Sequence, residues 1–186
     1  MLKRKKGTMQ KVINWVTFIP LAIFLLLVIL AFVALKEENT GKLPSAFIGK
    51  QPPKLTLSRL GSYPQLTQED LNPINNKITL INFWASWCPP CRVEHPQLEQ
   101  ISLMNDINLF GINYKDKEKA ALNFLTEFNN PYKKLGSDPL GRNALEWGVY
   151  GVPETFIIDS SGRIVFRHAG PITQDIYKKK IQNLLN

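Results

Sequence analysis

The chain has 186 residues, of which 44% are hydrophobic and 20% charged, and its formal net charge is +8. This composition is typical of a globular protein and excludes a disordered or low-complexity chain. The length leaves room for one soluble domain of ordinary size after a short N-terminal segment.

The positive charge is concentrated at the N-terminus, where five of the 23 cations precede residue 12 and no acid occurs before Glu37. From Lys36 onward, 18 cations face 15 anions. The dense basic run in this part, Lys178–Lys180, falls in a predicted helix, where such a run is usually a solvated face. Nucleic-acid binding would need a basic face on the domain itself, so we expect no nucleic-acid partner.

An uncharged apolar run of 24 residues, Val12–Leu35, follows the basic tail. A helix of about 20 apolar residues crosses a bilayer, and Pro20 is tolerated in such a helix. Because the cations precede the run, the positive-inside rule predicts a cytoplasmic tail and an exported domain. A cleaved signal peptide is the alternative, but its apolar region is about 7–15 residues long and ends in small residues, which Phe32-Val33-Ala34 matches poorly. Either segment delivers the domain to a compartment where disulfides persist.

The expected organisation is a basic tail at 1–11, a transmembrane anchor at 12–35, a Gly- and Pro-rich tether at 36–53 and a domain at 54–186. Strands are predicted at Lys54–Leu57, Ile78–Trp84, Ile107–Tyr114, Thr155–Asp159 and Arg163–Arg167, the last two joined by a tight turn. Helices are predicted after Cys88, at Lys117–Phe128, at Arg142–Trp147 and around Tyr177–Leu185. This order predicts an α/β fold in which helices cover both faces of a central sheet.

Both cysteines of the chain lie in one C-x-x-C motif, Cys88 to Cys91, at the junction of a buried strand and a helix. The free N–H groups and the dipole of a helix N-terminus stabilise a thiolate, which favours Cys88 as the nucleophile. Pro89 and Pro90 suit a first helical turn, where no N–H is needed. Cys91 lies three residues further on, can close a disulfide with Cys88 and is expected to be the less exposed, resolving thiol. A C-x-x-C in this setting indicates a redox pair.

Metal and haem sites are the alternatives for a C-x-x-C. A structural zinc needs four ligands, and the chain offers only His95 and His168 besides the cysteines. Haem attachment requires a histidine directly after the second cysteine, where this chain has Arg92. We therefore expect no metal and no cofactor, and we expect both histidines to be structural.

Pro153 precedes the buried run Phe156–Ile158 and, with a dithiol elsewhere in the same domain, is predicted to form a cis peptide bond with Val152. An ordinary trans proline in a loop is the alternative. A cis-proline that faces a dithiol leaves a backbone edge open for a bound peptide. We expect Trp87, Val152 and Pro153 to contact that peptide.

Glu94 shares the apolar stripe of its helix with Cys91, Leu98, Ile101 and Met104. A buried carboxyl has a raised pKa and can shuttle protons. The alternative is a surface glutamate near the helix start, favoured there by the dipole.

These segments together resemble the CcmG/DsbE family, membrane-anchored thioredoxin-like proteins of cytochrome c maturation. The resemblance extends from about Ile48 to the C-terminus. Its motifs lie at Asn82–Pro96, Gly111–Asp116, Asn130–Tyr132, Gly148–Asp159 and Arg167–Gly170. It implies a thioredoxin-like fold with a mixed sheet, in a periplasmic domain anchored to the inner membrane.

The resemblance also implies a reductive role. The family keeps the C-x-x-C-H cysteines of apocytochrome c, or of a maturation partner, reduced for haem ligation, with electrons from a membrane thiol transporter. Its active-site acids match Glu94 and Glu154 in this chain. Two alternatives remain, a general exported thiol oxidant or reductase and an apocytochrome-binding holdase. Sequence does not set the reduction potential that separates the first of these from the expected role.

Overall fold

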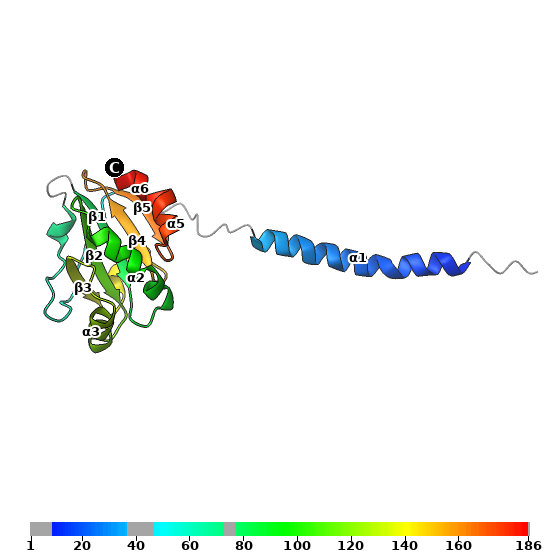
Figure 1. Ribbon diagram of the computed structural model, residues 1–186, viewed down its shortest axis with the longest axis horizontal. Coiled ribbons are helices and arrows are strands. Elements are labelled where there is room, and N and C mark those ends of the chain that lie inside the picture. Colours follow the sequence, from blue (N-terminus) through cyan, green and yellow to red (C-terminus); the bar gives the residue numbers. More distant parts are fainter. Residues whose placement is uncertain (1–8, 37–46, 73–76, 186) are drawn as a thin grey trace, which may run out of the picture. The chain divides into compact units, whose positions relative to one another are not determined.

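The computed structural model describes residues 9–36, 47–72 and 77–185, and the chain forms two compact units. The N-terminal unit contains the helix α1, Met9–Lys36, which includes the whole of the predicted anchor. Within the described residues, no helix combines the length and apolar character of a membrane span. The C-terminal unit carries the sheet and the remaining helices (Figure 1). Most of the predicted tether, residues 37–46, lies outside the described residues.

A five-stranded mixed sheet forms the centre of the C-terminal unit, in the order β3-β2-β1-β4-β5. The strands are β1 (Ile78–Trp84), β2 (Ile107–Tyr114), β3 (Lys134–Asp138), β4 (Glu154–Ile158) and β5 (Ile164–Ala169). β1 pairs with β2 in parallel, as β2 does with β3, whereas β4 is antiparallel to β1 and β5. β1 therefore lies in the middle of the sheet. Both of its faces are covered, as its nearly continuous apolar sequence predicted.

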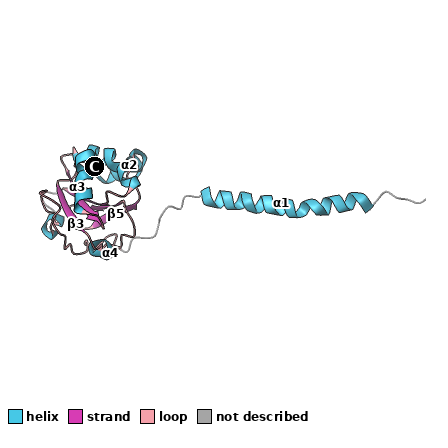
Figure 2. Ribbon diagram, turned by 90° about the horizontal axis from the view of Figure 1, so that it is seen from below, coloured by secondary structure: helices cyan, strands magenta, loops and turns pink. Residues whose placement is uncertain are grey.

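Helices cover both faces of the sheet, as predicted (Figure 2). The first face carries α2 (Pro89–Ser102), α3 (Glu118–Glu127) and the C-terminal helices. The second face carries α4 (Arg142–Glu146) and the short 3-10 helix η1 (Gln68–Leu71). Alternate residues of β1 serve the two cores: Leu80 and Trp84 pack on the first face, and Ile81 and Phe83 on the second.

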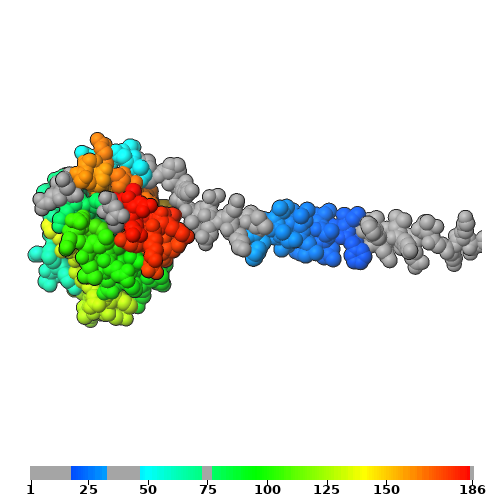
Figure 3. Space-filling model, turned by 45° about the horizontal axis from the view of Figure 1, so that its top comes forward, coloured from blue at the N-terminus to red at the C-terminus, as the bar shows by residue number. Residues whose placement is uncertain are grey.

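The C-terminal segment was predicted as one helix with an apolar stripe. It consists of α5 (Gln174–Ile176), a π-helical turn η2 (Tyr177–Ile181) and α6 (Gln182–Leu185). Ile181 is buried in the same core as Leu98 and Ile101 of α2, but Leu184 is exposed. Figure 3 shows this segment, in red, beside the green surface that includes α2. The extra residue in a π turn shifts the helical phase, which explains why the stripe is only partly buried.

The prediction of a strand at Lys54–Leu57 is wrong, because this segment is not part of any strand of the sheet. In this segment, side chains rather than a neighbouring strand satisfy the backbone. Leu55 N–H donates to Gln68 Oε1 at 2.7 Å, and Thr56 N–H donates to Asn143 Oδ1 at 2.7 Å. The end of the predicted tether also joins the domain, because Gly49 N–H donates to Ile164 O at 2.8 Å.

Candidate functional site

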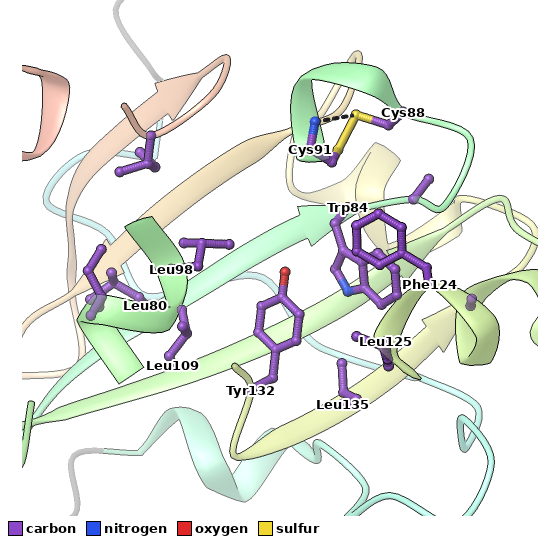
Figure 4. Packing of buried hydrophobic residues seen from close by; sticks show 14 of the residues in the cluster. Leu80, Trp84, Cys88, Cys91, Leu98, Leu109, Phe124, Leu125, Tyr132 and Leu135 are labelled. Carbon is purple, nitrogen blue, oxygen red and sulfur yellow. Dashed lines mark hydrogen bonds between the residues drawn. A yellow bond between two sulfur atoms is a disulfide. The ribbon is translucent and has the colours of Figure 1, made fainter. Parts of the chain in front are cut away.

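The two cysteines lie where β1 ends and α2 begins, and they form a disulfide (Figure 4). Cys88 is the N-cap residue of α2, and its sulfur accepts a hydrogen bond from Cys91 N–H at 3.1 Å. Pro89 and Pro90 occupy the first turn, as the sequence predicted. This N–H also donates to Cys88 O at 3.2 Å, and it points at Cys88 Sγ, where it would stabilise a negative charge on that sulfur.

The expected difference in exposure between the two sulfurs is absent from this oxidised state. Cys88 and Cys91 are each only 2% exposed. The disulfide holds both side chains against the core formed by Trp84 and Leu98, so Cys88 does not project into solvent. Exposed residues surround the pair instead, since Trp87 is 55% exposed and Pro89 and Pro90 are also exposed.

The second motif lies beside the disulfide. The Val152–Pro153 peptide bond is cis, as predicted. Val152 O lies 3.4 Å from Cys88 Sγ, and Val152 is only half-buried. The backbone before Pro153 therefore lies next to the sulfur that is expected to react.

Glu94 is buried, as the stripe on α2 predicted. Its side chain is 0% exposed. Asn82 Nδ2 donates to its Oε1 at 2.9 Å, and Ile172 N–H donates to its Oε2 at 2.9 Å. Glu94 thus lies one helical turn beyond Cys91, on the same buried face of α2.

Burial raises the pKa of Glu94 to about 7, although the donors from Ile172 and Asn82 lower it. Burial also raises the pKa of Tyr132, and the nearby Glu94 adds to that effect. A carboxyl that titrates near neutral pH can both accept and return a proton. Glu94 is therefore chemically able to exchange a proton with the thiol of Cys91 when the pair is reduced.

Glu154 does not join this cluster. Across the antiparallel β1–β4 ladder, Asn82 pairs with Thr155 and Phe83 pairs with Glu154. Glu154 therefore points to the face of the sheet opposite the disulfide. It forms an ion pair with Arg167 Nε. Burial raises the pKa of Glu154 more than Arg167 lowers it.

Arg167 connects Glu154 to the segment before the cis-proline. Its Nη2 donates to Gly148 O at 2.6 Å, and its guanidinium lies 5.7 Å from the ring centroid of Tyr150. Since Gly148 and Tyr150 precede Val152 closely in sequence, this pair helps to hold the segment that lies beside Cys88.

Asp116 fastens the loop that precedes Cys88. Its carboxylate accepts from Ser86 N–H at 2.6 Å, from Ser86 Oγ at 2.9 Å and from Asn113 Nδ2 at 3.0 Å. Trp87 Nε1 donates to Lys115 O at 3.1 Å. The approach to the dithiol is therefore held to the loop that follows β2.

The two histidines have structural surroundings, as expected. His95 Nε2 lies 2.9 Å from Asn129 O, and its ring packs edge-on against Phe124. His168 stacks on Phe166, and burial lowers its pKa. Among the residues that the structure describes, no group of three or more His, Cys, Asp or Glu could hold a metal ion.

Three polar residues of the site were not singled out as site residues from the sequence. Asn82, Thr155 and Tyr132 contact Glu94 directly or through one another. Asn82 could have been noticed as the one amide inside the apolar run of β1. Gly111 in β2 offers a weaker signal, because a Cβ there would lie 2.8 Å from Cγ of Tyr132, so the glycine makes room for that ring.

Comparison with known proteins shows which family the chain belongs to. The family model described as Redoxin matches residues 48–185. The thiol:disulfide interchange protein HelX of Rhodobacter capsulatus is 46% identical over 169 residues, which cover 90% of this chain and 94% of that protein. The thiol:disulfide interchange protein DsbE of Escherichia coli is 40% identical over 173 residues, covering 91% of this chain and 92% of that protein.

Solved structures give the same result for the fold. A crystal structure from Chlorobium tepidum, assigned as the thiol:disulfide interchange protein DsbE, superposes with a TM-score of 0.61 at 25% identity. The match covers 73% of this chain and 96% of that one. The chain therefore belongs to the Redoxin family, among the thiol:disulfide interchange proteins that include HelX and DsbE, and it is a thiol:disulfide oxidoreductase with a thioredoxin-like α/β fold.

Proposed function

We propose that this chain is a periplasmic dithiol reductant, which reduces the C-x-x-C-H cysteines of apocytochrome c, or of a maturation partner, before haem attachment. The observation that carries the proposal is the reactive pair itself. Cys88 is the N-cap residue of α2, and the buried carboxyl of Glu94 lies one helical turn beyond Cys91. The resemblance of the motifs to the CcmG/DsbE family supports the choice of substrate.

The proposed reaction begins with the reduced chain. The Cys88 thiolate attacks one sulfur of the substrate disulfide, and the second substrate sulfur leaves as a thiolate. Cys91 then gives its proton to the Glu94 carboxylate and attacks Cys88 Sγ. The first substrate sulfur leaves and takes up a proton. The substrate gains two electrons, and the chain ends with the Cys88–Cys91 disulfide, which is the state seen in the structure.

The substrate peptide would bind along the backbone beside the cis-proline. Val152 would offer main-chain contacts next to Cys88, whereas Pro153 would offer its ring, because it has no N–H and its carbonyl already accepts from Gly170 N–H. The exposed Trp87 would offer a further apolar surface. This arrangement would bring a substrate sulfur close to Cys88 without requiring a deep pocket.

We also propose that the apolar run Val12–Leu35 anchors the domain to the periplasmic side of the inner membrane, with the N-terminus in the cytoplasm. The length of the run and the basic tail before it support this topology. Since each turnover leaves a disulfide, a membrane thiol-electron transporter would have to return two electrons to the chain.

The experiment uses the reduced full chain in detergent and an oxidised peptide that carries C-x-x-C-H. We expect the chain to reduce the peptide, with two peptide thiols appearing for each Cys88–Cys91 disulfide that forms. The double variant Cys88→Ser, Cys91→Ser is the matched control and should do nothing.

Two other outcomes would point to the alternatives. A reduction potential close to that of strong oxidants, measured against glutathione, would favour a general thiol oxidant. Normal cytochrome c assembly in cells that carry only the double variant would favour a holdase, because binding would then suffice.

A further inference from the structure

A chain of hydrogen bonds runs through the first core and ends at Glu94. Tyr132 Oη donates to Asn82 Oδ1 at 2.7 Å. Asn82 Nδ2 donates to Glu94 Oε1 at 2.9 Å and to Thr155 Oγ1 at 3.0 Å. Tyr132 is 5% exposed and the other three side chains are 0% exposed, so water does not compete for these bonds. The polar groups of this chain therefore depend on one another for their hydrogen bonds.

The side-chain amide of Asn82 fits this chain in one orientation. If the amide were turned over, Oδ1 would face the Glu94 carboxylate, and two acceptors would then meet in a buried site. The Tyr132 hydroxyl opposes that turn, because it supplies the donor that Oδ1 needs where it now lies. Figure 4 shows the Tyr132 hydroxyl pointing into the core below the disulfide.

We propose that Asn82, held in place by Tyr132, is a positioning residue. It keeps the Glu94 carboxylate in one orientation and able to ionise while Cys91 resolves the mixed disulfide. The proposal rests on the proposed role of Glu94. It adds two residues to the machinery, and in the described structure neither of them forms a hydrogen bond with Cys88 Sγ or Cys91 Sγ.

The surroundings of Glu94 explain why an uncharged donor matters. The titratable groups on this face of the sheet include Cys88 and Cys91 at the start of α2, Tyr132 from the segment before β3, and His168 of β5, whose cross-strand partner Thr155 accepts from Asn82. The groups that favour its charged form are the Ile172 N–H and the Asn82 amide, and among the described residues no cation contributes. A buried carboxylate with two neutral donors depends strongly on each of them.

The test is Tyr132→Phe in the full chain. The change removes one hydroxyl and keeps the ring that stacks on Trp84, with centroids 5.9 Å apart. Without its donor, the Asn82 amide can turn, and its hydrogen bond to Glu94 weakens. We expect the pKa of the Glu94 carboxyl to rise by about one unit, measured by NMR of the carboxyl carbon. The midpoint of the pH profile for release of the mixed disulfide should shift to higher pH by the same amount.

Tyr177→Phe is the matched control. The hydroxyl of Tyr177 donates to Met104 Sδ at 3.5 Å and does not contact Asn82 in the described structure, so this variant should keep the wild-type profile. Asn82→Asp is a second variant, and it replaces the donor facing Glu94 by a second carboxyl. The two acids should titrate as a coupled pair, with one step at higher pH than in the wild type.

The possible outcomes separate the role of Asn82 and Tyr132 from the role of Glu94. An unchanged Glu94 titration and pH profile in Tyr132→Phe would overturn the positioning role, even if Glu94 itself proves essential. An unchanged pH profile in Glu94→Gln would instead remove the role of Glu94. The proposal is supported if the pH profile shifts in Tyr132→Phe and stays as in the wild type in Tyr177→Phe.

Discussion

Replacing Glu94 by glutamine should change how the stability of the protein depends on pH. Burial raises the pKa of this carboxyl from 4.5 to about 7. Folding therefore favours the protonated form. The contribution of Glu94 to the free energy of unfolding is therefore largest below pH 4.5. It decreases as the pH rises from 4.5 to about 7, and it is constant at higher pH.

The size of the effect follows from the difference between the two pKa values. A difference of about 2.5 pH units corresponds to about 3 kcal/mol of the free energy of unfolding. The side-chain amide of the Glu94→Gln variant cannot ionise. Its oxygen can accept from Asn82 or from Ile172, but its NH2 group then faces the other donor, and this mismatch costs the variant a similar amount of stability at every pH. Between pH 4 and pH 8, the free energy of unfolding of the variant should therefore rise by about 3 kcal/mol relative to that of the wild type.

The assay is urea unfolding of the oxidised full chain in a non-ionic detergent at pH 4, 6 and 8, followed by the fluorescence of the buried Trp84 and Trp147. Glu99→Gln removes a half-buried carboxylate from the same helix and serves as the matched control. If the free energies of unfolding of Glu94→Gln and the wild type differ by the same amount at all three pH values, the reasoning is refuted.

Two further predictions concern other parts of the chain. Arg167→Met leaves the buried Glu154 without its cation and should destabilise the domain by about 3–5 kcal/mol in thermal or urea unfolding, whereas Arg167→Met with Glu154→Gln should recover most of that loss; equal destabilisation of both variants would argue against the pair. Protease added on the periplasmic side should digest the domain and spare the basic tail at 1–11, and a protected domain would contradict the proposed topology.

The central strands could be predicted closely because their sequences are nearly continuous apolar runs. β1 and β2 have the predicted bounds, Ile78–Trp84 and Ile107–Tyr114. β3 was missed, because Lys134–Asp138 contains a glycine and only one apolar residue. It forms a strand because β2 offers it an edge to pair with. That pairing is a tertiary effect, which local sequence does not carry.

The site could be predicted where one element decides it. The phase of a single helix was enough to place Glu94 beside Cys91 on a buried face. The contact between Tyr132 and Asn82 joins residues 50 positions apart, so no local pattern reveals it. The direction of Glu154 depends on the register of β4 against β1, which places Thr155 and not Glu154 on the side of the disulfide.

The most direct test of the account is to trap the mixed disulfide with Cys91→Ser in the full chain, in cells that assemble cytochrome c. Without the resolving thiol, Cys88 should remain joined to its substrate, and mass spectrometry should find a cysteine of a C-x-x-C-H segment or of its maturation partner. Cys88→Ser should trap little. Trapping through Cys91 would reverse the roles of the two sulfurs, and a random set of exported proteins on Cys88 would contradict the proposed substrate.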